Sequence, residues 1–203
     1  MNKVFKIIGG PNDGAYLEID TDEDAQSPRQ ETNDVCSLIF PPHTKLAHLD
    51  ESVNFALLDG EDQRKLADCF GIDANIGTHD DSAKYPIYCH DHSRIKLSTR
   101  PFSDAWDSGE IGWAVVPSDT VEREFNGDRA EVDACVNGEL HAFTQYLNGD
   151  VTGFTVLDNH NNEIDSCWGF YGTDPRDNGM QDHVEFENLV EINSPELPSS
   201  TEM

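Results

Sequence analysis

The residues with the clearest potential for metal binding or catalysis lie together in the stretch Cys89-His90-Asp91-His92. Alternate side chains of a β-strand share a face, so a strand here would place His90 and His92 on one side of its sheet. Two neutral imidazoles can bind zinc together, but a closed zinc site needs four ligands. Only residues distant in the sequence could complete it: Cys36, Cys69, His79 and Cys167. We therefore expect no metal ion and no other cofactor, and His90 and His92 are the candidate ligands if an ion binds.

Carboxylates and hydroxyls also stand beside tryptophan and glycine in two motifs, Trp106-Asp107-Ser108-Gly109 and Asp165-Ser166-Cys167-Trp168-Gly169. A thiol, an imidazole and a carboxylate can form a nucleophilic site, because such groups meet in space rather than in sequence. Cys167, His92 and Asp107 would be such a set. However, Asp and Ser beside Gly commonly bind turn amides, and a Cys among apolar neighbours is often a small core residue. An enzyme of unassigned chemistry is therefore the alternative hypothesis, and we expect a non-enzymatic protein.

Charge is the dominant property of this chain of 203 residues, because Asp and Glu number 40 against 13 Lys and Arg, giving a formal charge of -27. Such a field repels nucleic acid and anionic membranes, whose phosphates carry the same sign. A partner selected by charge would be basic. Three interpretations remain open. They are a surface that only confers solubility, the acidic surface of a halophile's protein, which would unfold at low salt, and a mimic of the phosphates of DNA.

The acidic residues that favour the mimic surround one predicted helix. Apolar residues recur at the helical spacing typical of an amphipathic helix, at Val132, Val136, Leu140, Phe143 and Leu147. The solvent side of this segment and of the one before it carries carboxylates, at Asp119, Glu122, Glu124, Asp128, Glu131, Asp133 and Glu139. Side chains three or four positions apart on a helix lie about 5–6 Å from each other, a spacing similar to that of phosphates along a DNA strand. We expect these residues to contact the partner, although any solvated helix in so acidic a protein would have the same pattern.

These residues need a scaffold, and the sequence predicts strands on both sides of the helix. Residues 3–8 and 15–19 are rich in β-formers and flank a Gly/Pro/Asn/Asp turn, which predicts a hairpin. Further strands are expected at 35–40, 87–88, 95–99 and 111–116. Helices are expected within 50–70 and from an N-cap at Ser118. Asn148-Gly149 would end the long helix, and residues 151–157 and 164–170 would form a second hairpin.

Elements in this order indicate an α+β fold, with a mainly antiparallel sheet packed against one long amphipathic helix. The aromatic fraction of 9% is enough for a folded core, although the hydrophobic fraction is only 36%. We divide the chain into a β-rich N-terminal annex (1–80), an α+β core (84–173) and an acidic C-terminal segment (174–203). The last ten or so residues of that segment are expected to be disordered.

Localisation is predicted from what the chain lacks. No apolar run approaches the roughly 20 residues that cross a bilayer, and the apolar stretch at the N-terminus is too short for a signal peptide. The cysteines number 5 and are widely spaced, which favours free thiols. We expect a cytoplasmic protein.

The motifs around the tryptophans resemble those of a family of uncharacterised small acidic proteins of bacteriophages, plasmids and integrated elements. The resemblance covers about residues 88–172. It is carried by Trp106-Asp107-Ser108-Gly109, Tyr146-Leu147-x-Gly149-x-Val151-x-Gly153-Phe154 and Asp165-Ser166-Cys167-Trp168-Gly169-Phe170-Tyr171-Gly172. The opening Gly9-Gly10-Pro11-x-Asp13-Gly14 is also similar to a short module of phage proteins. The family has no established catalytic residues, so the resemblance implies none here.

What the resemblance implies is a biological context. Small acidic proteins of mobile elements often counter host defences, and several unrelated anti-restriction and anti-CRISPR proteins are DNA mimics. We therefore expect a phage or mobile-element accessory protein of the host cytoplasm that inhibits a host DNA-binding defence protein, such as a restriction or CRISPR nuclease. It would bind through its acidic surface, with no direct contact to nucleic acid or membrane. Whether it forms a homodimer is left open.

Overall fold

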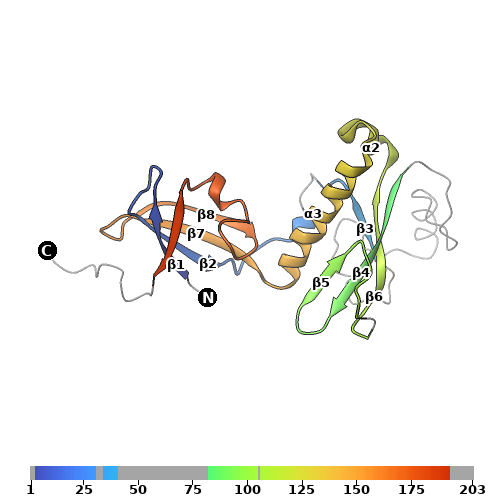
Figure 1. Ribbon diagram of the computed structural model, residues 1–203, viewed down its shortest axis with the longest axis horizontal. Coiled ribbons are helices and arrows are strands. Elements are labelled where there is room, and N and C mark those ends of the chain that lie inside the picture. Colours follow the sequence, from blue (N-terminus) through green and yellow to red (C-terminus); the bar gives the residue numbers. More distant parts are fainter. Residues whose placement is uncertain (1–2, 31–33, 41–81, 105, 193–203) are drawn as a thin grey trace. The chain divides into compact units, whose positions relative to one another are not determined.

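The computed structural model describes residues 3–30, 34–40, 82–104 and 106–192, and the chain divides into two compact units. Unit 1 comprises Met1–Gln26 and Gln145–Met203, and unit 2 comprises Ser27–Thr144. Unit 2 is thus inserted between the two segments of unit 1. Each unit has a β-sheet of its own (Figure 1).

The sheet of unit 1 is antiparallel and brings together strands from distant parts of the chain. Its five strands lie in the order β8-β7-β2-β1-β9. Their bounds are β1 (Lys3–Ile8), β2 (Tyr16–Thr21), β7 (Val151–Leu157), β8 (Glu163–Tyr171) and β9 (Asn188–Ile192). The two predicted hairpins, β1–β2 and β7–β8, are confirmed. The pairings of β2 with β7 and of β1 with β9 were not predicted, because they join segments far apart in the sequence.

Local side chains fix the turns of both hairpins. In the first turn, the carboxylate of Asp13 accepts a hydrogen bond from the amide of Gly9 (2.8 Å). Gly10 has a φ of +77°, and a Cβ there would lie 2.5 Å from the carbonyl oxygen of Glu185, so only glycine fits. In the second turn, the carboxylate of Asp158 accepts hydrogen bonds from the amides of residues 160 and 162 (2.7 and 2.9 Å). The bond from the amide of residue 160 to Asp158 forms an Asx turn, which explains why Asp is favoured at the start of this loop.

The core of unit 1 lies on one face of its sheet. Side chains from β1, β2, β7 and β8 pack there against Met180 of η3 (Met180–Asp182) and against the segment that leads into β9. Phe154 of β7 points into this core, whereas the neighbouring Gly153 lies on the opposite face. There the ring of Trp168 covers Gly153 so closely that a Cβ at this position would be 2.1 Å from Cε3 of the indole.

The sheet of unit 2 is also antiparallel and has four strands in the order β3-β6-β4-β5. The strands are β3 (Ser37–Ile39), β4 (Ala83–Asp91), β5 (Ile95–Ser98) and β6 (Ser108–Val116). The strands predicted at 87–88 and 111–116 are parts of the longer β4 and β6. A short 3-10 helix, η1 (Pro28–Gln30), precedes β3.

Two consecutive helices follow β6. They are α2 (Ser118–Phe125) and α3 (Arg129–Leu147). The backbone between them adopts left-handed conformations at Asn126 (φ +50°) and Gly127 (φ +76°), which ends α2. The predicted N-cap at Ser118 is wrong by one residue. The N-cap is Pro117, whose carbonyl accepts the first helical hydrogen bond, and no side chain caps the helix.

The apolar positions predicted for α3 are buried except the last, Leu147, which is half-buried. Val132, Val136, Leu140 and Phe143 are all buried. Side chains from the solvent-facing flank of α3 reach the strands of unit 2: the hydroxyl of Tyr85 donates to Asp133, and that of Thr99 donates to Asn137 (3.0 Å). In unit 2, α3 therefore contacts β4 and the residue that follows β5.

The α+β class and the dominance of antiparallel sheet are confirmed, but the strands form two sheets instead of one. The domain limits differ as well. Strands of the predicted annex (β1, β2), core (β7, β8) and C-terminal segment (β9) share the sheet of unit 1. The reason is pairing between distant strands, which local sequence patterns do not reveal. The helix predicted within 50–70 and the disorder predicted for the last residues lie outside the described residues.

Neither α2 nor α3 is a membrane-crossing helix: within the described residues, no helix combines the length and the apolar character that a bilayer requires.

Candidate functional site

The acidic residues predicted to contact a partner lie on α2, on α3 and between them. Most have exposed side chains: Asp119, Glu122, Glu124, Asp128, Glu131 and Asp133. Only Arg123 and Arg129 bring positive charge into this stretch. Arg123 pairs with Glu124 (Nε–Oε1, 2.8 Å) and, one helical turn away, with Asp119 (Nη1–Oδ2, 3.6 Å). The exposed carboxylates from Asp119 to Glu131 are called the acidic patch below.

Two of the exposed carboxylates also support the fold of unit 2. Asp128 accepts a hydrogen bond from the amide of Ala130 (2.8 Å), which satisfies an N–H at the start of α3. Asp133 accepts the hydrogen bond from the hydroxyl of Tyr85. Burial of the phenol and, after it, this bond to Asp133 raise the pKa of Tyr85 above its ordinary value. The phenol therefore stays protonated and keeps donating to Asp133.

Glu139, in contrast, faces the interior of unit 2, and its side chain is only 14% exposed. Its Oε2 atom lies 2.9 Å from Nη1 of Arg29, whose side chain is 1% exposed. The same carboxylate accepts the amide of Val35 (2.6 Å) and the thiol of Cys36 (2.9 Å). Glu139 thus holds η1 and the start of β3 against α3, and we leave it out of the acidic patch.

The two thiols near Glu139 are not activated nucleophiles. Burial and then the negative charge of Glu139 raise the pKa of Cys36 well above its ordinary value. The same two causes, in the same order, raise the pKa of Cys135. Because the thiolate is the reactive form of cysteine, both residues remain in their inert, protonated state.

A second cluster forms where β4 ends and β6 begins. His90 lies near the end of β4 and is paired with Ser108, the first residue of β6. The loop before β6 places Asp104 and Asp107 beside this histidine, so that ligand atoms of all three residues lie within 4.8 Å of one another. Nδ1 of His92 lies 2.8 Å from Oδ2 of Asp107. We refer to these four residues as the His/Asp cluster.

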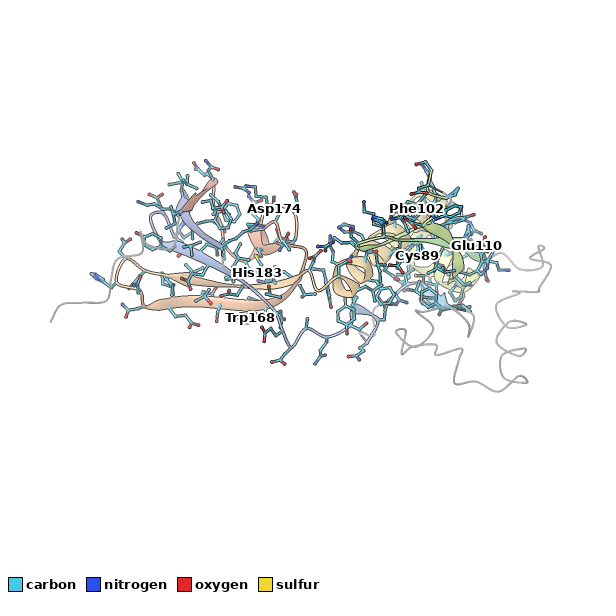
Figure 2. All side chains as sticks on the ribbon, turned by 90° about the horizontal axis from the view of Figure 1, so that it is seen from below. Cys89, Phe102, Glu110, Trp168, Asp174 and His183 are labelled. Atoms are coloured by element: carbon cyan, nitrogen blue, oxygen red, sulfur yellow. The ribbon has the colours of Figure 1, made fainter. Side chains whose placement is uncertain are left out.

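The loop that carries the two aspartates is held by its own hydrogen bonds. The amide of Trp106 donates to Oδ1 of Asp104 (2.9 Å), and the hydroxyl of Ser108 donates to the carbonyl of Asp104. The amide of Asp91 donates to the carbonyl of Asp107 (2.9 Å), which extends the pairing of β4 and β6 by one step. The ring of His90 packs against Phe102 at 5.6 Å between centroids; Figure 2 labels Phe102.

The hypothetical catalytic set is only partly assembled within one unit. His92 and Asp107 form a pair in unit 2, whereas Cys167 belongs to β8 of unit 1. There Cys167 packs against the hydrophobic core, as expected for a small core residue. Its neighbour Trp168, labelled in Figure 2, is 51% exposed and covers Gly153.

The sequence suggested the histidines of the His/Asp cluster but missed Asp104 entirely. Asp107 was considered only as a catalytic partner of His92. The missing information was the β4–β6 register, which pairs His90 with Ser108 and so brings the preceding loop back over the histidine. A sequence signal did exist, because Asp104 and Asp107 lie in a short segment shortly before the strand predicted at 111–116.

Comparison with known proteins adds no relative: no protein family, curated protein or solved structure matches the chain.

Proposed function

We propose that this protein binds the basic, DNA-binding surface of another protein through the acidic patch, and so competes with DNA for that surface. The observation that carries the proposal is the exposure of closely spaced carboxylates on two consecutive helices of a chain with a formal charge of -27. A protein with this charge associates readily with basic surfaces and is repelled by nucleic acid.

The arrangement of the patch suits such a surface. Asp119 and Glu122 are three positions apart on α2, and Asp128 and Glu131 are three positions apart at the start of α3. The pair on α2 therefore shares one face of that helix, with about 5–6 Å between Cβ atoms, and the second pair flanks the start of α3. The left-handed residues between the helices fix the direction in which the second pair continues after the first.

A hollow beside α2 offers a place for a basic side chain of the partner. It has a volume of about 650 Å³ and is lined by residues of α2 and of the segment leading into β3. Asp34 and Glu124 contribute carboxylates to its wall. Arg123 also lines the hollow and pairs with Glu124, so a partner's Arg would compete with it for the carboxylates, to which Arg can bind through two parallel hydrogen bonds.

The experiment uses the full chain, immobilised and exposed to bacterial lysate at low salt, with elution by rising salt and then by duplex DNA. The retained protein is purified, and its affinity is measured for two variants with equal loss of charge. The first replaces patch carboxylates by amides: Asp119→Asn, Glu122→Gln, Glu124→Gln, Asp128→Asn and Glu131→Gln. The matched control makes the same kind of change at exposed positions of unit 1: Asp177→Asn, Asp182→Asn, Glu185→Gln, Glu187→Gln and Glu191→Gln.

We expect the retained protein to be a DNA-binding protein that duplex DNA displaces. It should bind the patch variant at least tenfold more weakly and the control variant with nearly native affinity. Raising the salt should weaken the native complex, since exposed charges are screened beyond roughly 10 Å at 0.1 M salt. Equal losses in the two variants would mean that only total charge matters. Affinity that barely changes with salt would reject mimicry.

A further inference from the structure

The His/Asp cluster has the composition of a transition-metal site rather than of a charged surface loop. We propose that His90, Asp104 and Asp107 bind one divalent transition-metal ion, of which Zn²⁺ is the representative, and that His92 positions Asp107 for this role. Imidazole nitrogen and carboxylate oxygen are ordinary zinc ligands, whereas Ca²⁺ and Mg²⁺ take oxygen ligands. Three protein ligands leave at least one coordination position for water or another ligand.

The spacing of the ligand atoms fits an ion after a small adjustment. Zinc bonds to nitrogen and oxygen are about 2.0–2.2 Å long and tetrahedrally arranged, so two ligand atoms of one ion are about 3.5 Å apart. The ligand atoms of His90, Asp104 and Asp107 lie within 4.8 Å of one another. Closing this gap requires a movement of roughly one ångström, which is within the reach of side-chain rotation for the exposed Asp104.

In each aspartate, one carboxylate oxygen is hydrogen-bonded within the protein, which leaves the other oxygen available to an ion. In Asp104, Oδ1 accepts the amide of Trp106, and Oδ2 lies 3.9 Å from Nε2 of His90. In Asp107, Oδ2 is bonded to Nδ1 of His92, which leaves Oδ1 for an ion. Hydrogen bonds of this kind to the far oxygen of a ligand orient it, and they are a usual part of metal sites.

The imidazole of His90 is held in place without a hydrogen bond. Nδ1 of His90 is buried and has no hydrogen-bond partner among the residues that the structure describes. The ring is instead positioned by its contact with Phe102 and by the strand pairing of β4 with β6. Its Nε2 lies 3.9 Å from Oδ2 of Asp104, and ligand atoms of His90 and both aspartates lie within 4.8 Å of one another.

Charge also favours a cation here. Two carboxylates and a neutral imidazole would exactly balance the charge of one divalent ion, and the chain as a whole carries a formal charge of -27. A field of this sign raises the local concentration of cations. The same field would also collect cations loosely all over the surface, so the experiment has to separate one specific site from general attraction.

The test is titration of the full-length, chelator-treated protein with Zn²⁺ by calorimetry, in the presence of excess Mg²⁺ to saturate general attraction. We expect one tight equivalent. His90→Ala and the double variant Asp104→Asn/Asp107→Asn should lose it. His92→Ala should keep the stoichiometry but weaken binding by about 10–100-fold, as for other residues that only orient a ligand. The matched controls are His160→Ala and Asp165→Asn, which change exposed residues of the same types in unit 1.

A second, spectroscopic measurement reports where the ion binds. Trp106 is 94% exposed and lies between the two aspartates in the sequence, so Ni²⁺ bound in the cluster should quench its fluorescence. The variant Trp106→Phe should abolish that quenching without changing the Zn²⁺ stoichiometry. Circular dichroism shows whether each variant remains folded. Equal loss of Zn²⁺ in the control variants, displacement of Zn²⁺ by Mg²⁺, or full retention in His90→Ala would each overturn the proposal.

Discussion

The carboxylate of Glu139 can be tested as an interior ion-pair partner by replacing Glu139 with alanine. The change removes the charge 2.9 Å from Nη1 of Arg29 and the acceptor of the Cys36 thiol. Removing one member of a buried ion pair costs about 3–5 kcal/mol. Asp34 remains 3.2 Å from the same guanidinium and offsets part of the loss, which places the expected cost at about 3 kcal/mol, the low end of that range.

The matched control is Glu131→Ala, which removes an exposed carboxylate from the first turn of the same helix. Its cost should be below about 1 kcal/mol, the usual size of a charge–dipole contact at a helix start. The assay is equilibrium unfolding in urea followed by helical circular dichroism, because both α2 and most of α3 belong to unit 2. If Glu139→Ala and Glu131→Ala lowered the free energy of unfolding equally, the interior role of Glu139 would be refuted.

Three further predictions concern single residues. Gly153→Ala should destabilise the protein by about 1–3 kcal/mol in urea unfolding, because the added Cβ collides with Trp168. The loss of stability should be smaller in a Trp168→Ala background, and an equal loss in both backgrounds would exclude the collision. Cys36 should be alkylated far more slowly than Cys167 in peptide mapping, even at alkaline pH, because burial beside a carboxylate raises its thiol pKa; equal rates would contradict this. Asp158→Ala should lower the melting temperature at neutral pH. Hydrogen bonds in the turn lower the pKa of the Asp158 carboxyl, so its stabilisation is present above the ordinary carboxyl pKa and is lost as the pH falls through the lowered value. A melting-temperature difference that persists at low pH would contradict this origin.

Local elements were predictable because their determinants are local. The burial of Val132, Val136, Leu140 and Phe143 follows from helical spacing alone. The two hairpins follow from their turn residues. The N-cap of α2 was misplaced because Ser118 and Pro117 are adjacent and both suit the start of a helix, and the choice depends on backbone angles that composition does not fix.

The arrangement of the candidate sites was less predictable, because it depends on contacts between distant segments. The acidic residues were predicted to be exposed from their residue types, yet the interior position of Glu139 depends on Arg29, which lies in η1, far from α3 in the sequence. Similarly, the sequence pointed to His90 and His92, whereas the positions of Asp104 and Asp107 depend on a strand register. In each case, the position of the residue depends on a contact between distant segments, which no periodicity in the sequence indicates.

The insertion of unit 2 into unit 1 has a consequence for biosynthesis. All of unit 2 leaves the ribosome before β7, β8 and β9 exist, so unit 2 can fold while β1 and β2 still lack their neighbours. During that interval β1 and β2 expose unpaired edges, which are prone to pair with other chains. After synthesis of β7 and β9, β7 pairs with the free edge of β2 and β9 with the free edge of β1. The amide of Asp22 then bonds to the carbonyl of Val151 (2.8 Å), where the chain leaves and re-enters unit 1. The points where the chain leaves and re-enters unit 1 are adjacent, so a short turn could replace unit 2. In a circular permutant that begins at β7, all strands of the unit 1 sheet would be contiguous in the sequence.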